Sequence, residues 1–320
     1  MLLSTTPGVD LCAVLTLALL FDWLLGDPKA LYRRVPHPVA LFGWLVGRLD
    51  AELNRGEARR LRGLAAILLT TGLAACIGAL LTRIFSALPV GWLIEILAVA
   101  TLVAQRDLYG HVAAVARALD RDGLYGGRLA VAHIVGRDPQ SLDAAGVGRA
   151  AIESCAENFS DGVVAPVFWY LLLGLPGLMA YKAINTADSM IGHISPRYRR
   201  FGWAAARLDD LVNLIPARLA GGLLALAAFP WAEASNAWRA MWRDARRHRS
   251  PNAGWQEAAM AGALGLALNG PRRYGGVIKD DPWMGIGRSA VTSADIRRAL
   301  RLYAIACGFV IVAVWLCWLI

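Results

Sequence analysis

The chain has 320 residues, of which 57% are hydrophobic, and its 33 Lys and Arg against 24 Asp and Glu give a net charge of +9. That apolar fraction exceeds what a soluble core of this size needs, which excludes an ordinary soluble protein. The arginines are spread through the segments between apolar runs, as in the cytoplasmic loops of membrane proteins, so the charge does not indicate nucleic-acid binding. The remaining reading of the charge is attraction of anionic ligands such as phosphates. The five cysteines form no CxxC pair, which argues against a zinc site or a disulfide framework.

The first predicted membrane helix covers residues 9–25. It has no basic residue before Leu11 and leads into Gly26-Asp27-Pro28 without a small-residue cleavage site, so we interpret it as a helix and not as a signal peptide. His37 follows between two prolines, which keep its backbone out of a helix. This histidine is either part of a rigid turn or held at the mouth of a site.

Further apolar runs predict further membrane segments. They cover 64–82, 84–105, 162–181, 219–232 and 302–320, most of them close to the roughly 20 residues that cross a bilayer. Residues 26–63 carry eight Lys and Arg, whereas only Arg83 separates the second run from the third, so residues 26–63 are expected in the cytoplasm. We predict an all-α, polytopic integral membrane protein with about 4–6 membrane segments, some of them re-entrant, and helical cytoplasmic loops, forming a single domain over 1–320.

A stripe of charged residues with a period of four precedes the run 162–181. It consists of Arg149, Glu153, Glu157 and Asp161. On one continuous helix these side chains share a face, and like charges four residues apart cost about 0.2–0.5 kcal/mol per pair. Arg149 can offset Glu153, and Mg²⁺, which prefers oxygen ligands, can offset Glu157 and Asp161. The alternative is a solvated acidic face, although Asn158 and Ser160 in the same turn favour a site.

A second polar block follows the same run, which prolines and glycines interrupt. Lys182, Asn185, Ser189 and His193 recur at helical spacing, and Asp188 lies among them. Such a set is a poor membrane surface and a good polar site. Further on, Arg207 precedes the adjacent acids Asp209 and Asp210, which point about 100° apart on a helix and are not expected to chelate one ion together.

The charge of the second block conflicts with a simple topology. If 162–181 and 211–232 both cross, residues 182–210 lie outside, yet 182–218 holds six Lys and Arg. We therefore expect one or both runs to be re-entrant or broken, so that the two polar blocks meet near the cytoplasmic face.

The region after residue 233 is basic and then rich in small residues. Arg239, Arg243, Arg246 and Arg247 form a predicted basic helical face that suits either anionic lipid headgroups or a phosphate ligand. The stretch 257–262 predicts a helix that packs closely against another, and 281–282 together with 285–287 predicts a loop.

Several motifs together carry a resemblance to a known family. They are GDP at 26–28, PHPV at 36–39, RDLYGHV at 106–112, GRD at 136–138, RAAIESCAENFSDGVVAPVFWY at 149–170, YKAINTADSMIGH at 181–193, FGWAAARLDD at 201–210, IPARL at 215–219 and SPNAGWQEAAMAGALG at 250–265. In these motifs the sequence resembles the CobD/CbiB family, the adenosylcobinamide-phosphate synthases of cobalamin biosynthesis. The resemblance covers nearly the whole chain in order.

The resemblance implies a multi-pass enzyme of the cell inner membrane. It implies an amide ligase that joins a propionate carboxylate of adenosylcobyric acid to (R)-1-aminopropan-2-ol or its O-phosphate, with ATP and Mg²⁺, giving adenosylcobinamide or its phosphate. The corrinoid is then a substrate, membrane lipid surrounds the protein, and other enzymes of the cobalamin pathway are further candidate partners. We expect the polar site to face the cytoplasm.

This chemistry assigns expected roles to the polar residues. The expected catalytic residues are His193, His37, Lys182 and Asp188; the expected substrate-binding residues are Asn158, Asn185, Arg207, Arg218 and Asn252; the expected metal ligands are Glu153, Glu157, Asp161 and Asp210. Lysine and arginine suit a transferring phosphoryl group, histidine suits deprotonation of the amine, and asparagine suits the amides around the corrin ring. The alternative function is a corrinoid-handling membrane scaffold or transporter without chemistry of its own.

Overall fold

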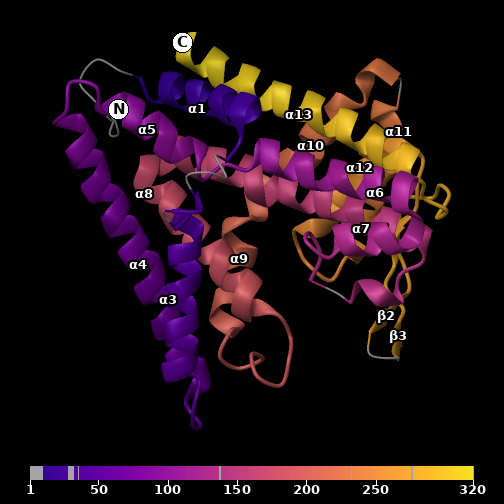
Figure 1. Cartoon of the computed structure of the whole chain (residues 1–320), viewed down its shortest axis with the longest axis horizontal. Coiled ribbons are helices and arrows are strands. Elements are labelled where there is room, and N and C mark those ends of the chain that lie inside the picture. Colours follow the sequence, from indigo (N-terminus) through magenta and orange to yellow (C-terminus); the bar gives the residue numbers. More distant parts are fainter. Residues whose placement is uncertain are drawn as a thin grey trace. The chain divides into compact units, whose positions relative to one another are not determined.

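The fold is almost entirely helical, as the sequence predicts (Figure 1). The computed structural model describes residues 10–27, 32–34, 36–136, 138–231, 233–274 and 277–319. Its α-helices are α1 Leu11–Leu25, α3 Pro38–Leu53, α4 Arg59–Ser86, α5 Gly91–Ala100, α6 Gln105–Val131, α7 Ala144–Phe159, α8 Ala165–Ala187, α9 Trp203–Val212, α10 Leu214–Ala227, α11 Ala234–Asp244, α12 Ala253–Leu264 and α13 Ser293–Leu319. Of the expected motifs, Pro28 and Arg137 lie outside the described residues.

Short elements complete the described chain. The 3₁₀ turns are η1 Pro139–Ser141, η4 Phe229–Trp231 and η5 Ala245–Arg247, and the π-turns are η2 Ser160–Val164 and η3 Asp188–Gly192. Two antiparallel pairs join strands β1 Leu268–Asn269 with β4 Trp283–Met284, and β2 Arg272–Tyr274 with β3 Val277–Lys279. The loop that the sequence predicted at 281–282 and 285–287 is confirmed, and Trp283 and Met284 between these two stretches pair with β1.

Four continuous helical segments in the described chain are long and apolar enough to cross a membrane. They are Arg59–Ser86, Ala144–Gly192, Leu214–Trp231 and Ser293–Leu319, and the shorter apolar helix α1 adds 15 residues. Four lies within the expected range. The predicted span 84–105 is wrong as a single helix, because α4 ends at Ser86 and α5 has only 10 residues, about 15 Å at 1.5 Å per residue.

The apolar run 162–181 is broken, as its prolines and glycines predict. Gly174 leaves the helical conformation inside α8, with φ 65° and ψ −156°, and Pro176 follows within the same helix. Glycine tolerates this positive φ, and the missing proline N–H removes a hydrogen bond from the helical ladder. Whether this break makes the segment re-entrant in a bilayer stays a prediction.

The chain divides into two compact units, each assembled from interleaved segments. Unit 1 consists of Met1–Ala104, Ala165–Asn213 and Ala313–Ile320, and unit 2 consists of Gln105–Val164 and Leu214–Val312.

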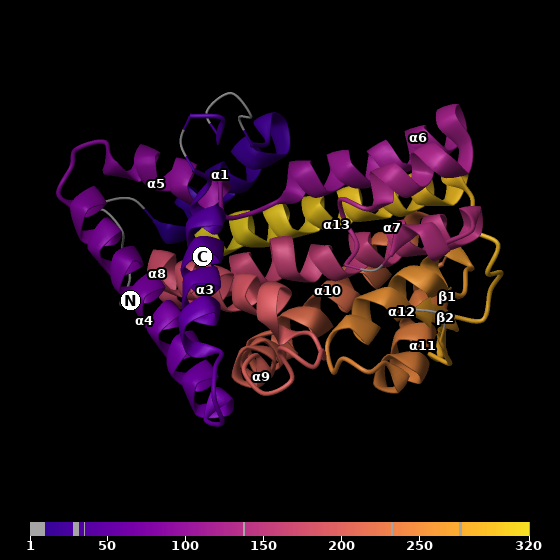
Figure 2. The same cartoon turned by 60° about the horizontal axis from the view of Figure 1, so that its bottom comes forward.

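In unit 1, α4 packs along α8, and α3 lies beside both helices (Figures 1 and 2). Small residues make this approach possible: a Cβ on Gly78 would lie 2.7 Å from the backbone of Pro176, and one on Gly63 would collide with the carbonyl oxygen of Phe201. Phe201 is fully buried in a core with Val46, Ile67 and Ile191.

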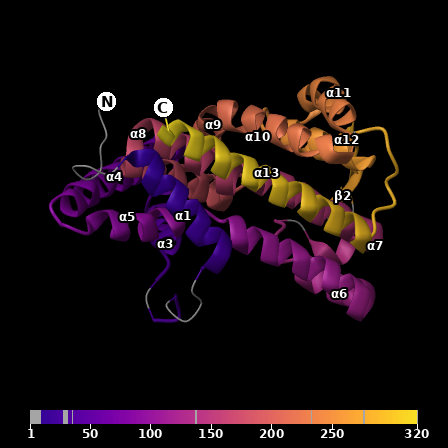
Figure 3. The same cartoon turned by 90° about the horizontal axis from the view of Figure 1, so that it is seen from above.

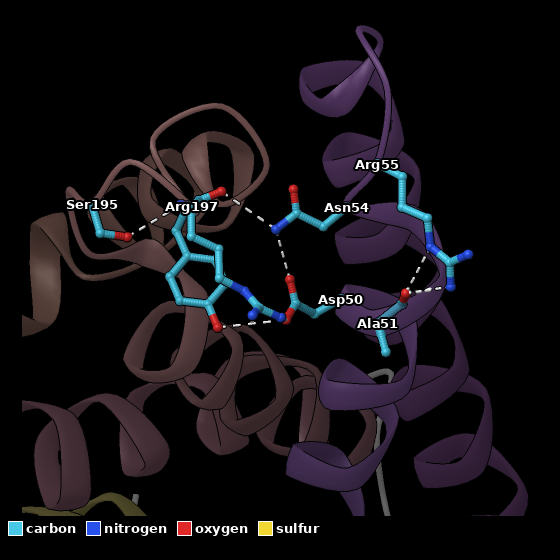
Figure 4. Close-up of polar contacts among 7 residues, drawn as sticks. Asp50, Ala51, Asn54, Arg55, Ser195 and Arg197 are labelled. Atoms are coloured by element: carbon cyan, nitrogen blue, oxygen red, sulfur yellow. Dashed lines mark hydrogen bonds and ion pairs between the residues drawn. The ribbon is translucent and has the colours of Figure 1, made fainter.

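A buried acid ties the segment before α9 to α3. Arg197 lies 2.6 Å from the Asp50 carboxylate, whose side chain is 8% exposed. Asn54 donates to Asp50 at 2.8 Å and to the Arg197 carbonyl oxygen at 3.4 Å, so the acid and the loop are joined twice (Figure 4). The Tyr198 hydroxyl adds a 3.5 Å contact to Asp50. This set of contacts holds residues 193–202 against the end of α3.

In unit 2, α10, α11 and α12 pack together, and α6 packs on α7 (Figure 3). The predicted close packing of the helix at 257–262 is confirmed, because a Cβ on Gly262 would lie 2.5 Å from the Asn236 carbonyl oxygen of α11. The buried Tyr303 hydroxyl donates to the Gln105 carbonyl oxygen at 2.9 Å, which joins α13 to the start of α6.

Candidate functional site

Each of the two polar blocks predicted from the sequence contains a π-turn. Helix α7 passes directly into η2 at Ser160, and α8 passes directly into η3 at Asp188. A π-turn places one extra residue in a helical turn, which changes the direction of the side chains that follow, and such turns are frequent at functional sites. Sequence periodicity does not signal either turn.

In unit 1 the second polar block forms a hydrogen-bonded network around Asp209. The side-chain amides of Asn185 and Asn213 donate to the two Asp209 oxygens at 3.4 and 3.0 Å. The Tyr181 hydroxyl lies 3.0 Å from the Asn213 side-chain oxygen and donates to it, which orients the amide. The predicted residue Asn185 thus belongs to a site whose central acid, Asp209, the sequence analysis did not select.

Three carboxylates gather at this network. Asp188 lies close enough to Asp209 and Asp210 for the charges to interact. Burial, together with the charge of Asp188, raises the pKa of Asp209 to about 7. Burial also raises the pKa of Asp210, although Arg207 offsets part of this effect from 3.0 Å. A carboxyl group that titrates near neutral pH is suited to proton transfer.

Glycines fix the shape of the turn that carries Asp188. A Cβ on Gly192 would collide with an Asp188 carboxylate oxygen, and a Cβ on Gly202 would collide with the Ile191 carbonyl oxygen. The carboxylate therefore lies over Gly192, four residues further along the π-turn. A side chain at either glycine would displace the turn.

The remaining predicted residues of unit 1 differ in exposure. Lys182 is 9% exposed within α8, and His193 is exposed at the end of η3, with its ring edge-on to Tyr198 at 4.8 Å. Arg207 is exposed and pairs with Asp210. His37 is the N-cap of α3: its Nδ1 accepts the Val39 backbone N–H at 3.2 Å, and its Nε2 lies 3.2 Å from Asp27.

The period-four stripe of unit 2 does not form one uniform face. Glu153 is buried and accepts the Asn269 backbone N–H at 2.8 Å, whereas Glu157 is exposed. Arg149 donates to the Ser289 carbonyl oxygen at 2.6 Å. Asp161 lies inside η2, where the α-helical repeat has already ended. The prediction of one shared face assumed one continuous α-helix through Asp161, and the π-turn η2 interrupts that helix at Ser160.

Two predicted asparagines of unit 2 lie at helix ends, Asn158 near the end of α7 and Asn252 at the N-cap of α12. The Asn158 amide donates to the carbonyl oxygen and hydroxyl of Ser154, at 2.9 and 3.2 Å. Asn252 is buried at the start of α12, where the Ser250 hydroxyl accepts the backbone N–H groups of Asn252 and Ala253 at 3.2 Å each. Arg218 lines a cavity together with Arg246 and His248, residues that sequence reasoning did not connect with it.

The expected metal ligands divide between the units, with Glu153, Glu157 and Asp161 in unit 2 and Asp210 in unit 1. Across the part of the chain that the structure describes, no three His, Cys, Asp or Glu side chains form a group that could hold a metal ion. This donor set does not fit a metal centre built by protein ligands alone.

Comparison with known proteins identifies the family. The family described as CobD/Cbib protein matches residues 15–303. A cobalamin biosynthesis protein CobD from Sinorhizobium sp is 54% identical over 311 residues, which cover 93% of this chain and 96% of that protein. Its counterpart from Rhizobium meliloti (strain 1021) is 52% identical over 94% of this chain and 95% of that protein.

A third relative, the cobalamin biosynthesis protein CobD of Rhodobacter capsulatus, is 49% identical over 92% of this chain and 93% of that protein. No solved structure gives a significant match. The family match and these full-length relatives agree with the motif order in the sequence. The chain therefore belongs to the CobD/CbiB family of cobalamin biosynthesis.

Proposed function

We propose that this protein is a membrane ligase that joins a propionate carboxylate of adenosylcobyric acid to (R)-1-aminopropan-2-ol or its O-phosphate. The product is adenosylcobinamide or its phosphate. The observation that carries the proposal is the 54% identity, over nearly the full length, to a protein named for cobalamin biosynthesis, together with the family's implied reaction. A network of half-buried amides and acids beside apolar helices supports it, because such groups suit a polar substrate at a membrane.

Amide formation needs an electrophilic carboxyl group and a neutral amine. A free carboxylate is a poor electrophile, and an ammonium group has no lone pair to attack with. ATP with Mg²⁺ supplies the activation in this proposal, on the strength of the family resemblance alone. The expected metal ligands do not form a metal-binding group within the described residues, so no step is assigned to the metal. The proposed roles belong to side chains of this chain.

His193 is a better candidate than His37 for accepting the amine proton. His37 Nδ1 caps α3, and His37 Nε2 is buried 3.2 Å from Asp27, so neither nitrogen is open to a substrate. In the described residues no hydrogen bond to the His193 ring is found, and the ring is exposed. A general base needs an accessible lone pair, and the exposed ring of His193 offers one.

The carboxylate network supports the role of Asp188 and adds Asp209. Asn185 and Asn213 fix the orientation of Asp209, and Asp188 lies within its electrostatic reach. We propose that this cluster holds the ammonium form of the amine before proton loss, and that Lys182 and Arg207 offset negative charge on the substrates. Asn158, Asn252 and Arg218 remain proposed substrate contacts in unit 2.

We further propose that the protein lies in the cell inner membrane with residues 182–210 facing the cytoplasm. The six Lys and Arg of 182–218 support this orientation. Arg199→Cys, introduced into a chain whose five cysteines are replaced by alanine or serine, provides the test. Impermeant maleimide should label it only after the membrane is opened. Labelling from the periplasm of intact cells would contradict the orientation.

The decisive experiment uses purified protein in detergent with adenosylcobyric acid, Mg-ATP and aminopropanol phosphate or aminopropanol. Mass spectrometry follows the corrinoid, and chromatography follows the nucleotide. We expect the corrinoid to gain the mass of the amine less one water, with matched loss of ATP. Tight corrinoid binding without this gain, in protein that remains folded, would overturn the ligase and favour the corrinoid-handling scaffold.

A further inference from the structure

A cavity of unit 2 gathers positive charge from separate elements. It has a volume of about 430 Å³ and lies where the start of α10, the turn η5 and the entry to α12 meet. Its lining includes Arg218, Trp242, Arg246, His248, Ser250 and Trp255. Cavities of this size hold small molecules, and their few polar groups determine which ligand fits.

The two arginines of the cavity have no acidic partner. Arg218 and Arg246 are close enough for their positive charges to interact. Among the described residues, no carboxylate lies within ion-pair distance of either. The neighbouring arginines behave differently: Arg243 and Arg247 lie 2.5 and 3.7 Å from the buried Asp244. Two like charges that lie close together without a counter-charge repel each other. A bound anion would offset this repulsion, because it attracts both guanidinium groups.

Aromatic side chains hold one of these arginines in place. The Arg218 guanidinium lies over the Trp255 ring, 4.6 Å from its centroid, and Trp255 is only 5% exposed. Trp242 packs edge-on against Trp255 at 5.1 Å. One Arg218 nitrogen donates to the Leu214 carbonyl oxygen, and a guanidinium has five N–H groups, so others remain for a ligand. A stacked guanidinium loses less freedom when it binds an anion.

The Ser250 hydroxyl adds a further donor to the cavity. The Ser250 oxygen already accepts two backbone N–H groups at the start of α12, so its own O–H is left to donate. The Ser250 backbone N–H donates to His248 Nδ1 at 3.0 Å, which places the proton of the neutral ring on Nε2, 3.8 Å from a Glu257 oxygen. His248 thus uses its Nδ1 as an acceptor within the turn that leads into α12. Donors that converge without an acceptor select an anion.

We propose that this cavity binds a phosphate group through Arg218, Arg246 and the Ser250 hydroxyl. The volume beyond the phosphate is bounded by Trp242 and accommodates a small organic remainder. Two sources supply this chemistry: a soluble phosphate ester, or a phospholipid headgroup, since Arg218 lies near the start of a helix apolar enough to cross a membrane. Identification with the phosphorylated amine rests on the proposed function, whereas phosphate binding does not.

The test compares the full-length protein with two arginine variants in detergent at constant ionic strength. Arg246→Gln removes a cavity donor that is exposed and supports no described ion pair. Arg239→Gln is the matched control, because Arg239 is exposed on the adjacent α11 and lies outside the cavity. Isothermal titration with inorganic phosphate measures the Kd, and native mass spectrometry measures retained phospholipid. Unfolding midpoints show that both variants are folded.

We expect Arg246→Gln to weaken phosphate binding at least about tenfold, the effect of one lost charge-assisted hydrogen bond, and Arg239→Gln to leave it unchanged. Phospholipid that is retained by the wild type and the control but lost from Arg246→Gln would support the same phosphate site, with a lipid as its source. Equal binding by all three proteins, or no binding together with unchanged lipid, would overturn the proposal.

The ligase assay separates this proposal from the proposed function. A raised KM for aminopropanol phosphate in Arg246→Gln, with unchanged kcat, identifies the phosphorylated amine as the source. Phosphate binding by a wild type without ligase activity would leave the cavity established and the ligase overturned. An active ligase whose phosphate binding does not depend on Arg246 would establish the ligase and overturn the phosphate site in this cavity.

Discussion

The buried carboxylate of Glu153 accepts a hydrogen bond from the backbone N–H of Asn269, which lies 116 residues further along the chain. The contact joins α7 to β1 and places a residue expected to bind metal in a structural role. Glu153→Ala should lower the free energy of unfolding by about 1–3 kcal/mol, because it leaves a buried donor unsatisfied. Thermal unfolding in detergent measures this loss. Glu157→Ala, on the exposed side of the same helix, is the control, and equal stability of the two variants would refute the role.

Ionisation of Asp209 should destabilise the folded protein as the pH rises. Burial and the charge of Asp188 raise the pKa of Asp209 to about 7 from its ordinary value of 3.8. Between these two values the folded state binds more protons than the unfolded state, so stability falls with rising pH. Asp209→Asn should flatten the dependence of the unfolding midpoint on pH over this window. Glu57→Gln, at an exposed position, should keep the wild-type slope. An unchanged slope in Asp209→Asn would show that another group titrates.

Two glycines of α4 should respond oppositely to the same substitution. A Cβ at Gly63 meets the Phe201 carbonyl oxygen, whereas no described atom lies within 4 Å of a Cβ at Gly72. Gly63→Ala should destabilise by about 1–3 kcal/mol through overpacking. Gly72→Ala should be neutral or stabilising by up to about 1 kcal/mol, because alanine favours the helix. Unfolding midpoints of both variants provide the measurement, and a tolerated Gly63→Ala would contradict the close approach.

Removal of Arg197 should loosen the loop 193–202. Arg197→Ala leaves the Asp50 carboxylate, which is 8% exposed, without its cation, and the loop loses one of its links to α3. We expect faster cleavage by a protease at this loop under conditions where the rest of the chain stays intact. Arg199→Ala, two residues away and exposed, should be cleaved at the wild-type rate. Equal cleavage of both variants would remove Arg197 from this role.

The sequence predicted the helical membrane architecture because apolar runs of bilayer length carry a strong signal. The same signal misled at 84–105, where hydrophobicity continues through a turn at Leu88-Pro89-Val90-Gly91 that ends α4 and starts α5. The proline and the glycine in that turn are the sequence signals that predict an interruption of the helix. Length and hydropathy alone therefore predict a single membrane helix at 84–105 that the structure does not form.

The candidate site was predictable only in part. Asn185 and Asp188 share a helical segment, so the sequence could place them together, and the structure brings both near Asp209. Asp209 was not selected, since its contact with Asn185 joins residues 24 positions apart and depends on how α9 packs. The stripe through Asp161 failed as a single face because no propensity scale predicts the π-turn at Ser160. Local patterns identified the segments, and tertiary contacts determined the partners.

The interleaved units impose an order on biogenesis. The first part of unit 1 ends at Ala104, and its next segment begins only at Ala165. Gly63 therefore leaves the ribosome well before Phe201, and at roughly 5–20 residues per second the delay is on the order of ten seconds. During that interval α4 has no native partner in α8. The early helices must be sheltered by the insertion machinery or by lipid, and a nascent chain released too soon becomes a substrate for membrane quality control.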